Sequence, residues 1–278
     1  MKETWRFINS GKLKPNENMA MDEAILFGII NKNDPPAIRV YDWNPPTVSF
    51  GYHQKINEHI LLDKVKEYGF GLVRRPTGGR AVLHYDEVTY AVISRTDGIL
   101  AGSVLESYQK IARILLATLH EIGIDATMQD SLPSEKEQKT WVNPCFTSAS
   151  KYEINYKGKK IIGSAQIRKG SALLQHGSIL LNHNQELMAE LMPMKSNKEK
   201  ETMKKLLFRK TVAINDLIEN SLSFNDFVNI LKKNFQKHLG ISFSENGDLT
   251  FYERKLYEGF KNKYNINKIY RFVDLKKS

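Results

Sequence analysis

Residues 151–182 have the sequence KYEINYKGKKIIGSAQIRKGSALLQHGSILLN, and this stretch decides the fold. β-Rich runs alternate in it with two turn signals, Lys157-Gly158 and Gly170-Ser171. This spacing predicts three consecutive antiparallel strands joined by tight hairpins. Such a meander places antiparallel pairs in the sheet and argues against a fold made of alternating βαβ units.

Helical periodicity lies on both sides of the meander. The clearest helix is 104–122, which begins after the capping box formed by Ser103 and Glu106 and ends at Gly123. Because helices come first, many strands follow and helices then return, we expect an α+β fold with mixed or antiparallel sheets flanked by helices. The other expected helices are 16–30, with Asn16 as N-cap, 57–68, 185–191, 195–210 and 223–239; the other expected strands are 37–43, 47–52, 71–75 and 81–95.

Composition excludes several classes of protein. The chain has 278 residues, of which 41% are hydrophobic and 26% are charged, and these are ordinary globular proportions. Its single cysteine excludes a disulfide framework and fits a reducing compartment. No run of apolar residues is long enough for a membrane span, and no apolar segment follows Met1 as in a signal peptide. We therefore expect a cytoplasmic protein.

Positive charge is concentrated late in the chain. The formal net charge is +10, and residues 195–278 contain 18 basic and 10 acidic side chains. Either a solvated, lysine-rich helical surface or an electrostatic guide for an acidic partner explains this excess. Nucleic acid is not expected as a partner, because the basic residues form no zinc-finger, KH or RRM pattern.

Three arginines surround two glycines in Arg74-Arg75-Pro76-Thr77-Gly78-Gly79-Arg80, between two expected strands. Glycine lets a backbone approach a ligand closely, and arginine binds carboxylates and phosphates. The spacing is not that of a P-loop. The segment is therefore either a substrate-binding loop that leads to His84 or a hairpin turn with surface arginines.

Cys145 follows a polar stretch, 131–141, that we expect to be a loop. An isolated cysteine is often a small buried hydrophobe. As a thiolate it is a nucleophile, and an ammonium within about 4–6 Å typically lowers a thiol pKa by roughly 1–3 units. Lys159 and Lys160 in the meander are candidates for that ammonium. Cys145 is thus either a reactive nucleophile or a structural core residue.

Small side chains at Gly163-Ser164-Ala165 remove bulk from one end of an expected strand, and Gly177 permits close approach on the next strand. These residues either open a groove for a slender ligand or mark a β-bulge. His84 and His176 are each either a hydrogen-bonded core residue or an acid–base group. No spacing of histidine and acidic residues indicates a metal site, and no G-x-S-x-G elbow indicates a serine nucleophile.

Together, residues 74–84, the Cys145-Phe146 pair, residues 158–166 and residues 174–180 resemble the lipoate–protein ligase and octanoyltransferase family, which shares its fold with biotin protein ligases. The resemblance covers nearly the whole chain, and its closest match is the cysteine-dependent octanoyltransferases of the LipM type. It implies a biotin/lipoate-protein-ligase-like catalytic domain over 32–243. The N-terminal helix in 1–31 is expected to pack on this core, and 244–278 to form a short basic helical extension.

The resemblance also implies an activity, which is transfer of an octanoyl group from acyl carrier protein to a lysine of a lipoyl domain in lipoate biosynthesis. The glycine-cleavage H protein is the expected acceptor. Cys145 is then the acyl-thioester nucleophile and Lys160 the lysine that lowers its pKa, with Ile161, Ile162, Leu173 and Leu174 as candidate walls of an acyl tunnel. The expected substrate-binding residues are Arg74, Arg75, Thr77, Gly78, Gly79, Arg80, His84, Gly163, Ser164, Ala165, Gln166, His176 and Gly177.

One position departs from the pattern of the related ATP-dependent ligases. They have a third glycine beside the acyl-adenylate where this chain has Arg80, and a long cation there obstructs the adenylate site. We therefore expect that the protein does not use ATP. We also expect no metal or other cofactor, a monomer, and no nucleic-acid or membrane partner. The alternatives are an ATP-dependent lipoate–protein ligase and a non-catalytic acyl- or carrier-binding protein of the same fold.

Overall fold

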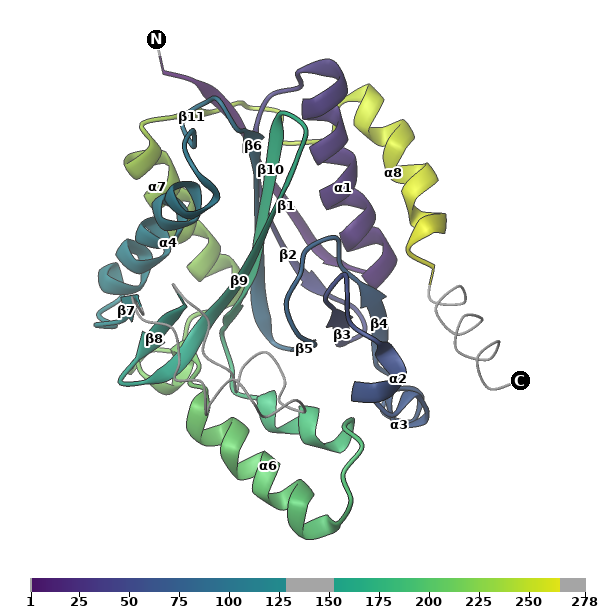
Figure 1. The fold of residues 1–278 in the computed structure, drawn as a ribbon. Coiled ribbons are helices and arrows are strands. Elements are labelled where there is room, and N and C mark those ends of the chain that lie inside the picture. The colour runs from purple at the N-terminus through teal and green to yellow at the C-terminus, as the bar shows by residue number, and fades with distance from the viewer. Residues whose placement is uncertain (1, 129–152, 266–278) are drawn as a thin grey trace.

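The computed structural model describes residues 2–128 and 153–265, in which a mixed eight-stranded sheet forms the centre of the fold (Figure 1). Strand β1 is parallel to both of its neighbours, and the remaining pairs are antiparallel. The expected α+β class with a mixed sheet is confirmed. In spatial order the strands are β11 (Ser242–Phe243), β1 (Thr4–Leu13), β2 (Ala37–Trp43), β6 (Glu87–Arg95), β10 (Ala172–Leu180), β9 (Lys159–Lys169), β8 (Ile154–Tyr156) and β7 (Thr127–Met128).

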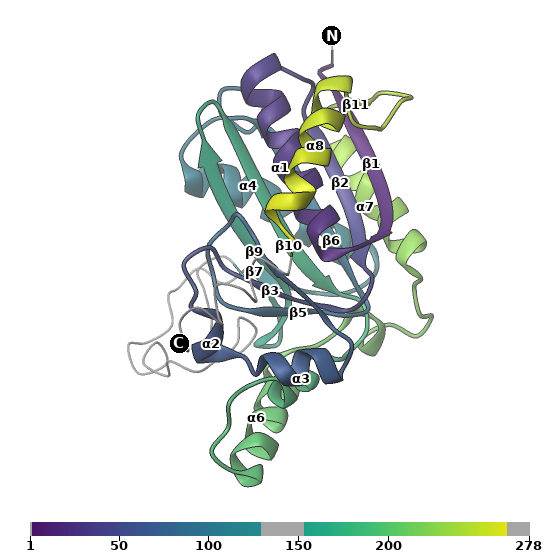
Figure 2. The same cartoon turned by 90° about the vertical axis from the view of Figure 1, so that its right-hand side faces the viewer.

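Helices cover both faces of this main sheet (Figures 1 and 2). Helices α4 (Val104–Glu121) and α7 (Phe224–Leu239) lie on one face, and α1 (Pro15–Lys32) lies on the other with α8 (Phe251–Lys263) packed against it. The two-residue period of a strand divides β6 between the two cores. Tyr90 and Val92 face α4 and α7, whereas Ala91 and Ile93 face α1. No helix in the described part of the chain has the length and apolarity needed to cross a membrane.

The meander and the helix before it form as predicted. Strands β8, β9 and β10 are joined by turns in which Lys157, Gly158 and Gly170 have positive φ. Helix α4 has the expected capping box, because the Glu106 backbone N–H donates to Ser103 Oγ at 3.2 Å and the Ser103 backbone N–H donates to Glu106 Oε2 at 2.6 Å. The meander and α4 are thus specified by turn and capping residues that lie close together in the sequence.

The N-terminal region differs from the prediction. Strand β1 was not expected, and α1 begins at Pro15, so that Asn16 lies in its first turn and is not the N-cap. Strand β1 looks polar because it contains Arg6, which is buried and paired with Glu253 of α8 at 2.5 Å. The segment β1–α1–β2 forms one parallel crossover, so the N-terminus contributes a strand to the main sheet as well as a helix.

A second, three-stranded sheet lies beside the main sheet in the order β4-β3-β5. The expected helix 57–68 is broken at Ile60-Leu61, where the Leu61 backbone N–H donates to Leu191 O. The expected strand 81–95 is also broken, at Asp86 with its φ of 48°, which lets its first part join the small sheet. The elements of this region are β3 (Thr47–Phe50), β4 (Gly71–Arg74), β5 (Val82–His84), α2 (Ile56–His59), α3 (Leu62–Glu67), the 3₁₀ helices η1 (Gln185–Glu190) and η2 (Ile214–Asp216), and α6 (Asn197–Lys210).

Candidate active site

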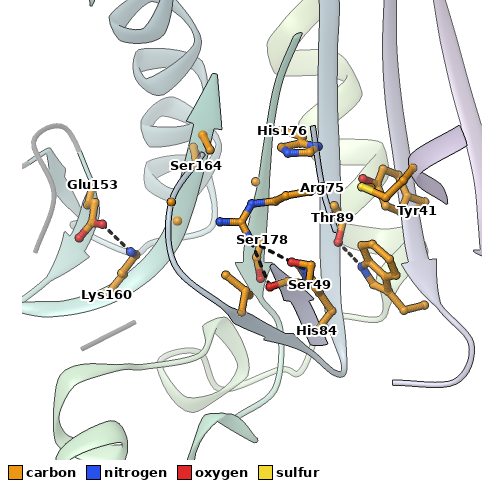
Figure 3. Close-up of a pocket in the computed structure, with 17 residues that line it drawn as sticks. Tyr41, Ser49, Arg75, His84, Thr89, Glu153, Lys160, Ser164, His176 and Ser178 are labelled. Carbon is orange, nitrogen blue, oxygen red and sulfur yellow. Dashed lines mark hydrogen bonds and ion pairs between the residues drawn. The ribbon is translucent and has the colours of Figure 1, made fainter. Parts of the chain in front are cut away.

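A cavity with about 620 Å³ of unfilled space, its open mouth included, lies between the two sheets (Figure 3). Its walls come from β2, β6, β9 and β10 of the main sheet and from β3 and β5 of the small one. The lining residues are Met19, Tyr41, Trp43, Ser49, Arg75, Gly79, Val82, His84, Thr89, Glu153, Lys160, Gly163, Ser164, Ala165, His176, Gly177 and Ser178.

A buried ion pair lies at one end of this cavity (Figure 3). Lys160 on β9 and Glu153 next to β8 each have only about 4% of the side chain exposed, and Lys160 Nζ lies 2.5 Å from Glu153 Oε1. A buried ammonium is stable only with a close carboxylate or hydrogen-bond acceptors around it. The pair therefore holds a positive charge at the cavity wall together with a group that can accept a proton from it.

His176 is held between two partners on the cavity wall. Its Nδ1 lies 3.2 Å from Asp22 Oδ2, and its Nε2 lies 2.6 Å from Thr77 Oγ1. Burial lowers the pKa of His176, and this outweighs the opposite effect of Asp22. A carboxylate only accepts, so the neutral ring donates from Nδ1 to Asp22 and accepts at Nε2 from Thr77.

Asp22 is the centre of a buried polar network behind this histidine. Arg39 donates to Asp22 Oδ1 at 2.7 Å, and the Tyr41 hydroxyl donates to Oδ2 at 2.9 Å. Burial by itself raises the pKa of Asp22, but Arg39 and His176 more than offset it, so the pKa lies below its usual value. The network thus links α1 through His176 to the loop that contains Thr77.

His176 makes a testable contribution to pH-dependent stability. The unfolded chain protonates this residue near pH 6.5, whereas the folded protein keeps it neutral to a lower pH. Between these pKa values the unfolded state binds more protons, so the free energy of unfolding falls as the pH is lowered, by at most about 1.4 kcal/mol per pH unit. Urea unfolding from pH 7.5 to 5 is expected to show a shallower slope for His176→Gln than for wild type.

The control for this measurement is the exposed His53. The His53→Gln variant makes the same substitution on the surface, and it is expected to retain the wild-type dependence of the unfolding free energy on pH. Parallel slopes for wild type and His176→Gln would show that His176 titrates alike in the folded and unfolded chain, contrary to the burial argument.

His84 lies toward the other end of the cavity, stacked on Trp43 with ring centroids 4.4 Å apart. Its Nδ1 is 2.7 Å from Glu87 Oε1, and its Nε2 is 2.7 Å from Ser49 Oγ. Glu87 also accepts a hydrogen bond from Ser178. Both ring nitrogens are thus engaged inside the protein, and this end of the cavity is a fixed polar wall.

The arginines of the loop bind protein backbone. Arg75 donates to the carbonyl oxygens of Gly78 at 2.8 Å and Arg80 at 2.7 Å, while Arg74 donates to three carbonyls in residues 51–54. Of the three arginines only Arg75 lines the cavity. Arg74 and Arg75 therefore shape the loop, a role that side-chain patterns do not reveal because the acceptors are backbone atoms.

Two glycines are required where this loop meets β3. Gly79 has a φ of +94°, a conformation that side-chain-bearing residues rarely adopt. A Cβ on Gly51 would lie 1.8 Å from Gly79 O, so the two backbones are in direct contact. This contact brings Gly79 to the cavity wall, as expected for a glycine that permits close approach.

The small residues on β9 and β10 lie together on the cavity wall. Gly163, Ser164 and Ala165 line it, and Gly177 is paired with Ser164. A Cβ on Gly177 would lie 2.6 Å from Gly163 O. The pairing of β9 with β10 is continuous here, so the bulge alternative is wrong. The small side chains leave space on the cavity side of an unbroken sheet.

Several expected site residues lie elsewhere. Arg74, Thr77, Gly78, Arg80 and Gln166 do not line the cavity. Thr77 reaches it indirectly, by its hydrogen bond to His176.

The expectation that Ile161, Ile162, Leu173 and Leu174 form acyl-tunnel walls is wrong. These side chains belong to the cores against α4 and α7 or against α1, because both faces of the main sheet are covered by helices. Cys145 and the expected loop 131–141 lie outside the residues that the structure describes.

Other lining residues were missed by the sequence analysis. Tyr41 and Trp43 are two apart in a correctly predicted strand, so the strand period already placed them on one face. Across the predicted Lys157-Gly158 hairpin Lys160 pairs with Asn155, and Glu153 lies two residues before Asn155, so the hairpin alone indicated that the two side chains are near each other. Met19, Ser49, Val82, Thr89 and Ser178 come from segments whose approach to the cavity depends on the tertiary fold.

The comparisons with known proteins agree with this architecture. Residues 14–236 match the family model of the lipoyl protein ligase A/B catalytic domain. Similar folds occur in a bipartite lipoate protein ligase from Thermoplasma acidophilum, with a TM-score of 0.77, 23% identity, and coverage of 94% of this chain and 93% of that one. Lipoate-protein ligase A bound with ATP gives a TM-score of 0.76 at 22% identity, covering 94% and 95%. The fold is thus that of a lipoyl-ligase-class catalytic domain.

Comparison with curated relatives identifies the group within this family to which the chain belongs. Octanoyltransferase LipM of Anoxybacillus flavithermus is 39% identical over 275 residues, covering 96% of this chain and 97% of the relative. Octanoyltransferase LipM of Bacillus subtilis is 42% identical over 246 residues, covering 86% and 88%. The chain belongs to the LipM octanoyltransferases within the lipoyl protein ligase A/B catalytic domain family. It is therefore an acyltransferase that acts in octanoyl transfer for lipoate biosynthesis.

Proposed function

We propose that the octanoyl group passes from the thioester of an acyl carrier protein to Cys145 and then to a lysine of a lipoyl domain. The observation that carries this proposal is the buried Lys160 ammonium on the cavity wall, 2.5 Å from Glu153. Beside a cysteine, such an ammonium stabilises the thiolate form. Cys145 is the only cysteine of the chain, so no other residue can supply this nucleophile.

The first step is a thioester exchange. The Cys145 thiolate attacks the carbonyl carbon of the octanoyl thioester, the new carbon–sulfur bond forms, and the carrier leaves as a thiolate. Because one thioester replaces another, this step needs no nucleotide. The tail lies against the apolar parts of Met19, Tyr41, Trp43 and Val82. Burial of its seven carbons contributes roughly 5–6 kcal/mol of gross affinity, at about 0.8 kcal/mol per CH₂.

The second step forms the amide. A neutral lysine amine of the acceptor attacks the octanoyl-Cys145 carbonyl, the carbon–nitrogen bond forms, and the Cys145 thiolate is released. The proton lost by the amine balances the one gained by the carrier sulfur. Glu153 is the buried acceptor through which this proton passes, by way of Lys160. Backbone N–H groups near Gly79 and Gly163-Ser164, on the cavity wall, are the candidates for stabilising the oxyanion.

The proposed acceptor is a lipoyl domain such as the glycine-cleavage H protein. It is supported by the names of the relatives and by the solved archaeal ligase, which was studied together with its E2 lipoyl domain. We propose that neither ATP nor a metal takes part. For ATP, the support is Arg80 at the position where the resembling ligases have a glycine.

An assay with two donors tests the proposed function. Purified protein with octanoyl carrier protein and a lipoyl domain is expected to give octanoylated domain without ATP, while free lipoate with ATP gives no product. Product from lipoate and ATP alone would identify a ligase instead. Binding of the carrier with no product from either donor would identify a non-catalytic carrier-binding protein.

A further inference from the structure

The positive charge of the C-terminal third is concentrated on helix α6. Residues 195–210 contain seven basic and two acidic side chains. Lys200 and Lys204 are paired with Glu190. Lys205 and Arg209, one helical turn apart and exposed, have no carboxylate within ion-pair distance among the residues that the structure describes. Helix α6 therefore presents positive charge that its own surroundings do not neutralise.

These two side chains border a surface groove, which we call the α6 groove. Glu186, Thr202, Lys204, Lys205, Phe208 and Arg209 line it. Phe208 is 57% exposed, although large aromatic side chains are usually more buried. An aromatic ring beside arginine is a combination enriched where proteins dock, because it supplies apolar area and directed charge together.

The α6 groove adjoins the strand that carries Lys160. The residue after α6, Thr211, bridges to Lys160, and the Val212 backbone N–H donates to Lys160 O at 3.1 Å. Lys159, next along the strand, has its Nζ 5.9 Å from the Phe208 ring centroid. Helix α6 lies below β8 and β9 in Figure 1, so a partner seated in the groove lies close to the strand that carries Lys160.

We propose that the α6 groove docks the acidic carrier domain that delivers the octanoyl thioester; this inference rests on the proposed function. Lys205 and Arg209 attract its acidic surface, and Phe208 packs against its apolar residues. The geometry favours the donor over the acceptor. A carrier holds its acyl group on a long, flexible phosphodiester arm that reaches the cavity from an adjacent surface, whereas an acceptor lysine must be at the mouth itself.

Charge reversal in the groove tests this proposal. Lys205→Glu combined with Arg209→Glu is expected to lower kcat/KM for octanoyl carrier protein about tenfold or more at low salt, because opposed charge slows encounter. With the N-acetylcysteamine thioester of octanoate, which has no carrier, the same variant is expected to match wild type. Lys233→Glu with Lys237→Glu on α7 is the matched control, since it changes the net charge equally on a distant helix and leaves both reactions unchanged.

A direct binding measurement tests the docking surface independently of the transfer reaction. Fluorescence anisotropy with labelled holo carrier protein is expected to show binding by wild type and the α7 control, and weaker binding by the α6 variant and by Phe208→Ala. This result supports the groove even if transfer assays fail, in which case only the proposed function is rejected. Equal binding by all four proteins, or none by wild type, overturns the proposed docking surface.

Discussion

The Cys145→Ala variant is expected to lose octanoyl transfer almost completely, by about 10⁴-fold or more in kcat, because the proposed reaction has no other nucleophile. Cys145 is the only thiol in the chain, so neighbouring cysteines cannot replace it. Cys145→Ser is expected to be nearly as inactive, since a hydroxyl is not ionised at neutral pH by a nearby ammonium. Transfer is measured as octanoylated lipoyl domain by mass spectrometry.

Folding and binding provide the controls for this loss. Both variants are expected to keep the wild-type midpoint of urea unfolding within experimental error and to bind holo carrier protein as wild type does. A folded Cys145→Ala variant with near-normal transfer would show that Cys145 is not the nucleophile.

The Lys160→Met variant is expected to lose activity and stability for separable reasons. Without the ammonium, the thiol pKa returns toward about 8.5, which lowers the thiolate fraction at neutral pH by roughly 8- to 30-fold. The rate is therefore expected to recover partly as the pH is raised. The substitution also leaves the buried Glu153 carboxylate without its ammonium, at a cost of roughly 3–5 kcal/mol.

A double variant separates the two effects. Glu153→Gln combined with Lys160→Met removes the buried carboxylate charge as well, so the free energy of unfolding is expected to recover most of what Lys160→Met lost. Transfer at neutral pH is expected to stay low, because the ammonium is still absent. Recovery of both stability and activity would mean that Lys160 serves the fold and not the chemistry.

Elements fixed by local signals were predictable from the sequence. The two turns of the meander and the capping box of α4 are made by residues close together in the chain, and they appear as expected. The lipoyl-ligase fold and the octanoyltransferase class were predictable because residues 74–84, 158–166 and 174–180 carry a specific pattern.

Features that depend on distant partners were not predictable. Strand β1 was missed because Arg6 makes it look polar until Glu253, 247 residues away, is placed beside it. For the same reason the link from Asp22 to His176, which come from α1 and β10, gave no sequence signal. Arg74 and Arg75 were predicted to bind substrate, and their hydrogen bonds to backbone carbonyls were not foreseen because such acceptors leave no trace in side-chain patterns.

The structure helps to choose between two explanations of the positive charge in residues 195–278. From the sequence, a solvated surface and a guide for an acidic partner explained it equally well. The structure separates basic side chains that are paired, such as Lys204, from exposed ones that border a groove, such as Arg209. The proposed binding surface for an acidic partner is thereby narrowed from the whole basic region to a few residues of α6, which charge reversal can test.

Intact-mass measurement of the protein after incubation with octanoyl carrier protein, without ATP and without acceptor, detects the proposed acyl-cysteine intermediate itself. We predict that wild type gains the mass of one octanoyl group in place of one thiol hydrogen. We also predict that hydroxylamine removes the group, as it cleaves thioesters, and that Cys145→Ala gains nothing. An unmodified wild type, or an equally modified Cys145→Ala variant, would contradict the proposed acyl-cysteine intermediate.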